Sequence, residues 1–189
     1  AEINEEVNAP VDTSTAGEGG TASNIVIGSG GRVILSGASG QTGPAVLANS
    51  DNSIEIASGG QVQITDTNAD GDDTRVTGAT GVQMNSGVAG DFISSGAVTL
   101  NDSFQNEDTN GNGLADGPFA DDADKTGVLF GEVGADGAAA AGQAPVDGSA
   151  TFNSNSQVTV VGQDSYGVRV ASGLTGDLIA GGVVNVRGE

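Results

Sequence analysis

Short runs in which apolar and polar residues alternate recur along most of the chain. Typical runs have the form Val-x-Ile or Val-x-Leu, and stretches of Gly, Ser, Asn and Asp separate them. Alternation with a period of two is typical of a β-strand that buries one face, and the small polar residues between the runs are typical of turns. The pattern therefore predicts an all-β protein built from many short strands.

The runs belong to an internal repeat. Residues 81–100 align with residues 167–186 without a gap, about half of the aligned positions are identical, and most of the others exchange similar residues. Weaker copies begin at Gly43 and at Gly127. Self-similarity at a regular spacing is the signature of repeat architectures, in which each structural unit packs on the next.

Two marker residues alternate along the repeat and define its length. A Val lies inside the strand after each small-residue turn, and a Gly opens the next strand. The shortest spacings, 9 residues from Val to Gly and 17 from Gly to Val, give a unit of about 26 residues, and longer units carry insertions at fixed places. The markers are Val33, Val62, Val98, Val158 and Val184, with Gly43, Gly81, Gly127 and Gly167.

Strands of this length and spacing favour a parallel β-helix, or β-solenoid, with coils of about 26 residues and acidic loop insertions. Each unit winds once around the axis with its Val and Ile inside, and the next unit stacks about 4.8 Å away. The high Gly content, 33 of 189 residues, suits the sharp corners of such a coil. A disordered Gly-rich tail is the alternative, but it would not keep the markers in register.

The domain boundaries follow from the same pattern. No alternating apolar run precedes Ile25, so residues 1–22 are predicted to form a flexible N-terminal arm and residues 23–189 the solenoid. Insertion loops are expected at about 65–80, 101–126 and 131–156. The two ends of the predicted solenoid are apolar, and uncovered strand edges associate readily. We therefore expect other copies of the chain, or further coils of a longer chain, to continue it.

Composition and charge exclude several classes of function. The chain has 25 acidic and 5 basic residues, no His and no Cys, and a formal net charge of −20. It therefore has no imidazole base, thiol nucleophile, Cys/His zinc site or disulfide, and its charge opposes binding to nucleic acid or anionic membranes. No apolar run reaches the ~20 residues of a membrane span. The opening Ala1-Glu2-Ile3 is typical of a processed, exported chain.

Two acidic loops carry the clearest candidate chemistry. The stretch from Asp66 and the stretch from Asp108 both place oxygen ligands at alternate positions before a Gly turn, as calcium loops do. Neither is a helix-loop-helix hand, because Thr77 and Phe119 occupy the positions where a bidentate Glu is needed. Ordinary turn chemistry is the alternative explanation. The predicted Ca²⁺ ligands are Asp66, Asn68, Asp70, Asp72, Asp73, Asp108, Asn110, Asn112, Asp116, Asp121, Asp122 and Asp124.

The position of the two loops in the repeat strengthens the calcium prediction. Both lie in the Val-to-Gly connection, so stacked coils would bring them to one edge of the solenoid. So much negative charge in one place would repel itself without a cation.

Other candidate residues have ordinary structural explanations as well. Asp91 and Asp177 occupy equivalent corners and could form a carboxylate pair for glycoside hydrolysis, but repeat-equivalent turn residues are usually structural. Arg169 on an outer strand face could contact an anionic sugar. The Ala-rich residues 134–145 form a protruding loop suited to packing against another chain. Tyr166, Phe104 and Phe119 are candidates for stacking against sugars or for anchoring loops.

Residues 9–16, 25–33 and 167–186 resemble the N-terminal passenger region of autotransporter-type surface proteins of Gram-negative bacteria. The resemblance rests on the style of the repeat and not on a catalytic signature. It implies a right-handed β-helix that is exported and stays associated with the outer membrane at the cell surface.

The expected function is therefore non-enzymatic. We expect a calcium-stiffened structural or adhesive solenoid that assembles into a fibre, stalk or surface layer and contacts surface glycans. The alternative is a β-helix polysaccharide lyase or hydrolase, which would need Lys or Arg beside acids in an exposed groove. The chain has only five basic residues, and none is placed beside a carboxylate pair on an evident strand face.

Overall fold

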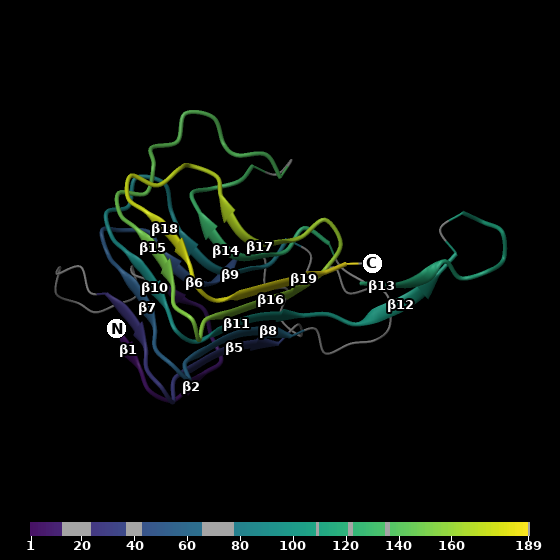
Figure 1. Ribbon diagram of the computed structural model, residues 1–189, viewed down its shortest axis with the longest axis horizontal. Helices are drawn as coiled ribbons and strands as arrows, with labels where there is room; N and C mark the ends of the chain where they lie inside the picture. The colour runs from purple at the N-terminus through teal and green to yellow at the C-terminus, as the bar shows by residue number, and fades with distance from the viewer. Residues whose placement is uncertain are drawn as a thin grey trace.

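The computed structural model describes residues 1–12, 24–36, 43–65, 78–108, 110–120, 123–134 and 137–188. Over these residues the chain is all-β and winds into a parallel β-solenoid with three long parallel sheets, which confirms the predicted fold class (Figure 1). Within this part of the chain, no helix is long and apolar enough to cross a membrane.

Three parallel sheets, here called A, B and C, form the sides of the solenoid. Sheet A contains β1 (Glu2–Ile3), β4 (Ile25–Ile27), β7 (Ile54–Ile56), β10 (Phe92–Ser94), β15 (Ala150–Phe152) and β18 (Leu178–Ala180). Sheet B contains β2 (Glu6–Val7), β5 (Arg32–Ser36), β8 (Gln61–Thr65), β11 (Ala97–Asn101), β16 (Gln157–Val161) and β19 (Val183–Arg187). Sheet C contains β3 (Val11–Asp12), β6 (Pro44–Ala48), β9 (Thr80–Met84), β14 (Thr126–Phe130) and β17 (Tyr166–Val170).

The marker valines form one continuous row inside sheet B. Parallel pairing places Val33 beside Val62, Val62 beside Val98, Val98 beside Val158 and Val158 beside Val184. Every one of these except Val184, in the last coil, is fully buried. The predicted Val register is therefore confirmed, and stacked β-branched side chains line this side of the core.

The glycine markers face that row from sheet C, with one exception. Gly81, Gly127 and Gly167 lie at one level, and a Cβ at Gly127 would stand 2.5 Å from a Val158 methyl carbon. The prediction for Gly43 is wrong, because Pro44 pairs with Thr80 and the level of Gly81 falls to Ala45. The coil of β6 therefore carries the Ala45 methyl group where the later coils have glycine.

The prediction of a flexible arm over residues 1–22 is wrong for the part that the structure describes. Residues 1–12 form the first coil, in which β1, β2 and β3 pair with β4, β5 and β6. Ile3 is buried, and Val7 and Val11 pack against the core. Strands of two residues bury one side chain each, so they leave no alternating apolar run in the sequence from which they could be predicted. Residues 13–22 lie outside the described residues.

Two of the predicted insertion loops have more structure than expected. Residues 101–126 contain an antiparallel hairpin of β12 (Phe104–Glu107) and β13 (Gly117–Ala120), which projects from the solenoid at the right of Figure 1. The loop at 131–156 ends earlier than predicted, because Val146 already lies in the core beside Leu174 and β15 follows. In the loop at 65–80, residues 66–77 lie outside the described part.

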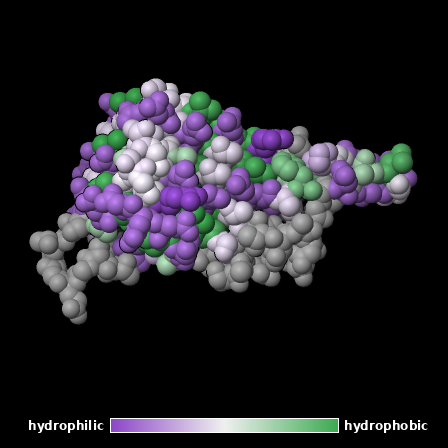
Figure 2. Space-filling model, turned by 90° about the horizontal axis from the view of Figure 1, so that it is seen from below, coloured by the Kyte–Doolittle hydropathy of each residue, from purple (hydrophilic) through white to green (hydrophobic). Residues whose placement is uncertain are grey.

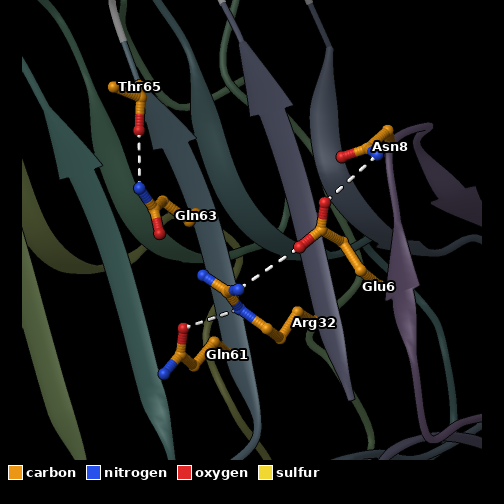
Figure 3. A network of polar contacts seen from close by, with 6 residues as sticks. All are labelled: Glu6, Asn8, Arg32, Gln61, Gln63 and Thr65. Atoms are coloured by element: carbon orange, nitrogen blue, oxygen red, sulfur yellow. Dashed lines mark hydrogen bonds and ion pairs between the residues drawn. The ribbon is translucent and has the colours of Figure 1, made fainter. Parts of the chain in front are cut away.

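The outer face of sheet B is joined across coils by polar side chains. Arg32 donates to Glu6 Oε2 at 3.2 Å and to Gln61 Oε1 at 3.1 Å, so three successive coils are linked (Figure 3). Both Arg32 and Glu6 are partly exposed, and pairs of this kind contribute less than about 1 kcal/mol. The stacked apolar core therefore dominates the stability of the solenoid.

Candidate functional site

The β12–β13 hairpin, here called the arm, carries the second predicted calcium loop at its tip. Four residue pairs join the two strands, from Phe104 beside Ala120 to Glu107 beside Gly117. Figure 2 shows the arm as a narrow projection that bears both hydrophilic and hydrophobic side chains. Leu114 in the tip loop is 71% exposed. The tip is therefore accessible from solvent on several sides.

Side chains of the tip loop hold its backbone in a tight curve. The Asp108 carboxylate accepts hydrogen bonds from the backbone N–H groups of Asn112 at 3.1 Å and Gly113 at 2.6 Å. Asn112 Oδ1 accepts one from the N–H of Leu114 at 2.8 Å. The side chains of Asp108 and Asn112 thus accept hydrogen bonds from the backbone of their own loop, as Asp and Asn do in ordinary turns.

The same loop brings the far end of the motif back to its start. Asn110 Nδ2 donates to Asp116 Oδ1 at 2.8 Å, and Asn110 Oδ1 accepts from the Asn112 N–H at 3.0 Å. Asp108, Asn110, Asn112 and Asp116 therefore share one loop, with two carboxylates and two amide oxygens. Calcium takes six to eight oxygen ligands, so backbone carbonyls and water would have to supply the rest. No group of three or more acidic residues that could hold a metal ion occurs in the described parts of the chain.

The loop also favours the ionised form of its first carboxylate. The hydrogen bond from the Gly113 N–H, followed by those of its neighbours, lowers the pKa of Asp108 below the ordinary value of 3.8. Hydrogen bonds to a carboxylate stabilise its charged form. Asp108 is therefore negative at neutral pH.

The remaining predicted ligands divide into two groups. Asp124 is described and does not join the tip loop, because it follows the hairpin on the solenoid side. The paired strands of the hairpin, at ~3.4 Å per residue, separate Asp124 from the tip loop by about 10 Å. Its backbone is left-handed, with φ of 59°, and its N–H donates to Gln163 O. The other group lies outside the described residues and comprises Asp66, Asn68, Asp70, Asp72, Asp73, Asp121 and Asp122.

The strands that flank the two acidic loops are neighbours. The first loop connects β8 to β9 and the second connects β11 to β14, and both strand pairs are adjacent in their sheets. The two insertions therefore leave the solenoid at the same corner in successive coils.

Asp91 and Asp177 belong to a row of corner residues that links the coils of sheet A from β4 to β18. Each side-chain oxygen accepts the backbone N–H of the equivalent residue in the next coil: Asn24 from Ser53, Ser53 from Asp91, Asp91 from Ser149 and Ser149 from Asp177. The coil of Ser149 lies between the two aspartates. They therefore do not face each other as a catalytic pair, and the Asp91 carboxylate accepts a hydrogen bond from the backbone of the next coil.

The exposed aromatic residues contact arginines. The Arg169 guanidinium lies 4.6 Å from the centre of the Tyr166 ring, and the Arg187 guanidinium lies 5.3 Å from that of Phe104. Arg169 also donates to the carbonyl of Gly137 in the Ala-rich loop. The contacts of Arg169 tie this loop to sheet C, and Arg187 ties the arm to the last coil.

The structure also shows a feature that the sequence pattern did not single out. The side chains of Lys125 and Asp102 meet in the interior at the foot of the arm and are both fully buried. Lys125 is the only lysine of the chain, and this is the one sequence feature that could have drawn attention to the pair. Nearby, a cavity of about 590 Å³ opens between the arm and the last coil, with Phe119, Asp164 and Arg187 in its lining.

Comparison with known proteins adds no assignment. No family model matches the chain, and neither does any curated protein or solved structure.

Proposed function

We propose that the chain is a non-enzymatic structural or adhesive module of a bacterial cell surface, stiffened by calcium. The observation that carries the proposal is the tip loop, where Asp108, Asn110, Asn112 and Asp116 converge in a solvent-exposed hairpin. These oxygens are the ligands that calcium prefers, and the chain offers no His or Cys for a softer metal. When bound, calcium would neutralise part of an acidic surface and stiffen the arm.

Thermal melting with and without calcium tests the metal. A ligand that binds only the folded form stabilises it by about 2.7 kcal/mol at a hundredfold excess over Kd. We expect calcium to raise the melting temperature and chelator to reverse the rise, and the double variant Asp108→Ala/Asp116→Ala to reduce the response. Glu55→Gln, an exposed carboxylate on sheet A, is the control and should respond like the parent. Identical melting curves in calcium and chelator would reject calcium stiffening.

The last coil supports a role in assembly. Leu178 is 51% exposed and Val184 47%, although both continue the buried rows of the preceding coils. The first coil has two-residue strands with Glu2 and Glu6, which are features that discourage pairing at an edge. We infer that another coil covers β18 and β19, from a second copy or from a longer chain, in a fibre, stalk or surface layer.

Sedimentation velocity in calcium tests assembly of the chain as it stands. Self-assembly predicts particles larger than the 18.3 kDa chain, and their fraction should rise with protein concentration. Val184→Lys places a charge in the exposed row and should reduce it. A single 18.3 kDa species at every concentration would reject assembly from copies of this chain.

The alternative function is that of a polysaccharide lyase or hydrolase. Incubation with acidic and neutral polysaccharides discriminates it, because a lyase releases unsaturated ends and a hydrolase releases reducing ends. The surface module predicts neither, and it predicts binding to surface glycans without turnover. Labelling of intact cells with an antibody to the solenoid tests its location, and labelling only after lysis would contradict a surface role.

A further inference from the structure

The buried pair at the foot of the arm brings an amine into contact with a carboxyl group. Lys125 Nζ lies 2.8 Å from Asp102 Oδ2 and 2.9 Å from the carbonyl oxygen of Val161. Both side chains have 0% exposure. Asp102 follows β11 and Lys125 precedes β14, so the two residues stand at the points where the chain leaves the solenoid for the arm and returns.

The choice of lysine at this position is informative. Lys125 is the only lysine, and the other four basic residues of the chain are arginines. Arginine is the usual residue for a buried ion pair, because its guanidinium is more weakly hydrated and forms several hydrogen bonds. Lysine differs chemically, because its amine is a nucleophile once it has lost a proton. A buried ion pair also carries the cost of taking two charges out of water.

We propose that Asp102 and Lys125 condense into an amide cross-link. A proton passes from the Nζ ammonium to the Asp102 carboxylate, which leaves a neutral amine beside a neutral acid. The lone pair of Nζ attacks Cγ, the Cγ–O bond to the protonated oxygen breaks, and one water molecule leaves with the second amine proton. The product is a secondary amide, and no oxidant, reductant or other reactant is needed.

The surroundings favour this reaction. Contact within the folded chain replaces a bimolecular encounter, which is a large advantage for a well-oriented pair. The hydrogen bond to Val161 O helps to position Nζ. Burial excludes the water that would hydrolyse the amide, and condensation removes both buried charges.

The cross-link would fasten the arm to the solenoid. It would join residues 102 and 125 and thereby close a covalent loop around β12, β13 and the tip loop. The chain has no cysteine, so a disulfide cannot do this. An amide also withstands reduction, unlike a disulfide. This inference goes beyond the proposed function and does not depend on calcium.

Intact mass spectrometry of the denatured full chain tests the proposal. We expect a mass lower than that of the sequence by one water molecule. Protease mapping should yield a branched peptide that joins Asp102 to Lys125, with no tryptic cleavage after Lys125. Lys125→Arg keeps the charge but should show the full mass of its sequence. Asp102→Asn should lose ammonia in place of water.

A succinimide at an Asp-Gly sequence such as Asp116-Gly117 would also remove one water molecule, so hydroxylamine, which cleaves succinimides, provides the control. The mass deficit should survive this treatment. Full sequence mass together with normal tryptic cleavage after Lys125 would overturn the proposal, as would a water loss that maps elsewhere. The parent chain alone gives this answer, so a variant that fails to fold does not obscure it.

Discussion

Two aspartates of the described chain, Asp124 and Asp164, have left-handed backbones, with φ of 59° and 48°. Both stand at the corner between sheets B and C, where Gly78 in the preceding coil has φ of 73°. Left-handed φ costs most L-residues 1–2 kcal/mol, whereas Gly, Asn and Asp accept it more readily. An acidic side chain in this acidic region therefore has a backbone explanation, separate from metal binding.

Replacement of Asp124 tests this explanation. Asp124→Ala should lower the free energy of unfolding by about 1 kcal/mol, while Asp124→Gly and Asp124→Asn should stay within about 0.5 kcal/mol of the parent. Urea unfolding measures the difference. If Asp124→Asn instead abolished the calcium response, Asp124 would be a ligand after all.

The Asp108 carboxylate gives the tip loop a pH dependence. Its pKa is lowered in the folded loop, chiefly by the Gly113 N–H. A lowered folded pKa means that the stabilisation is complete above the unfolded value, near 3.8, and is lost as pH falls through the lower folded value. The Gly113 amide resonance should therefore titrate at acid pH, below 3.8. Asp108→Asn should remove this titration, and an unchanged profile in that variant would contradict the assignment.

At the scale of the element, the glycine row of sheet C allows sheets B and C to pack closely, because a Cβ at these positions would meet the valines of sheet B. A Cβ at Gly127 would lie 2.5 Å from the Gly167 carbonyl oxygen and 2.5 Å from Val158 Cγ1. A backbone carbonyl cannot move aside as the end of a flexible side chain can. Gly43 has the same marker role in the sequence, yet a Cβ there meets nothing within 4 Å.

The contrast between these glycines is a direct test of the register. Gly127→Ala should destabilise the fold by about 1–3 kcal/mol through overpacking, whereas Gly43→Ala should cost little. Thermal and urea unfolding of both variants check it. Equal effects at the two positions would mean that they are equivalent, as the sequence pattern suggested.

Elements were predictable where a strand buries at least two alternating side chains. Four marker valines satisfy this condition, in β5, β8, β11 and β16. Val184 lies in the corresponding strand of the last coil, β19, whose residues are exposed. β1, β2 and β3 have two residues each and do not satisfy the condition. The sequence did not predict the core position of Val146 either, because Pro145 stands where the other copies have Gly87 and Gly173.

At the scale of the whole molecule, the arm and the solenoid are joined at few places. The Ala120 N–H donates to Gly188 O, and the Ala120 carbonyl accepts a hydrogen bond from Gln163 Nε2. Phe104 stacks under Arg187. Lys125 and Asp102 close the foot. The coils themselves are held by sheets A, B and C, whose core does not include the arm.

Replacement of residues 106–118 by a short Gly-Ser turn should therefore leave the solenoid folded. We expect the strand signal in circular dichroism to persist, the melting temperature to change by a few degrees, and the calcium contribution of the tip loop to disappear. A collapse of the strand signal would show that the arm contributes to the core.

The sequence by itself determined the solenoid, because period-two alternation and the spacing of Val and Gly are local properties that survive in any coil. It also determined the oxygen-rich tip loop, whose candidate ligands lie within nine residues of one another, from Asp108 to Asp116. Only the tertiary structure decided which distant residues stack. Asp91 accepts a hydrogen bond from a residue 58 positions away, and Lys125 meets Asp102 across the whole arm. The insertions vary in length, so spacing along the chain cannot show these contacts, and the side-by-side packing of successive coils creates them.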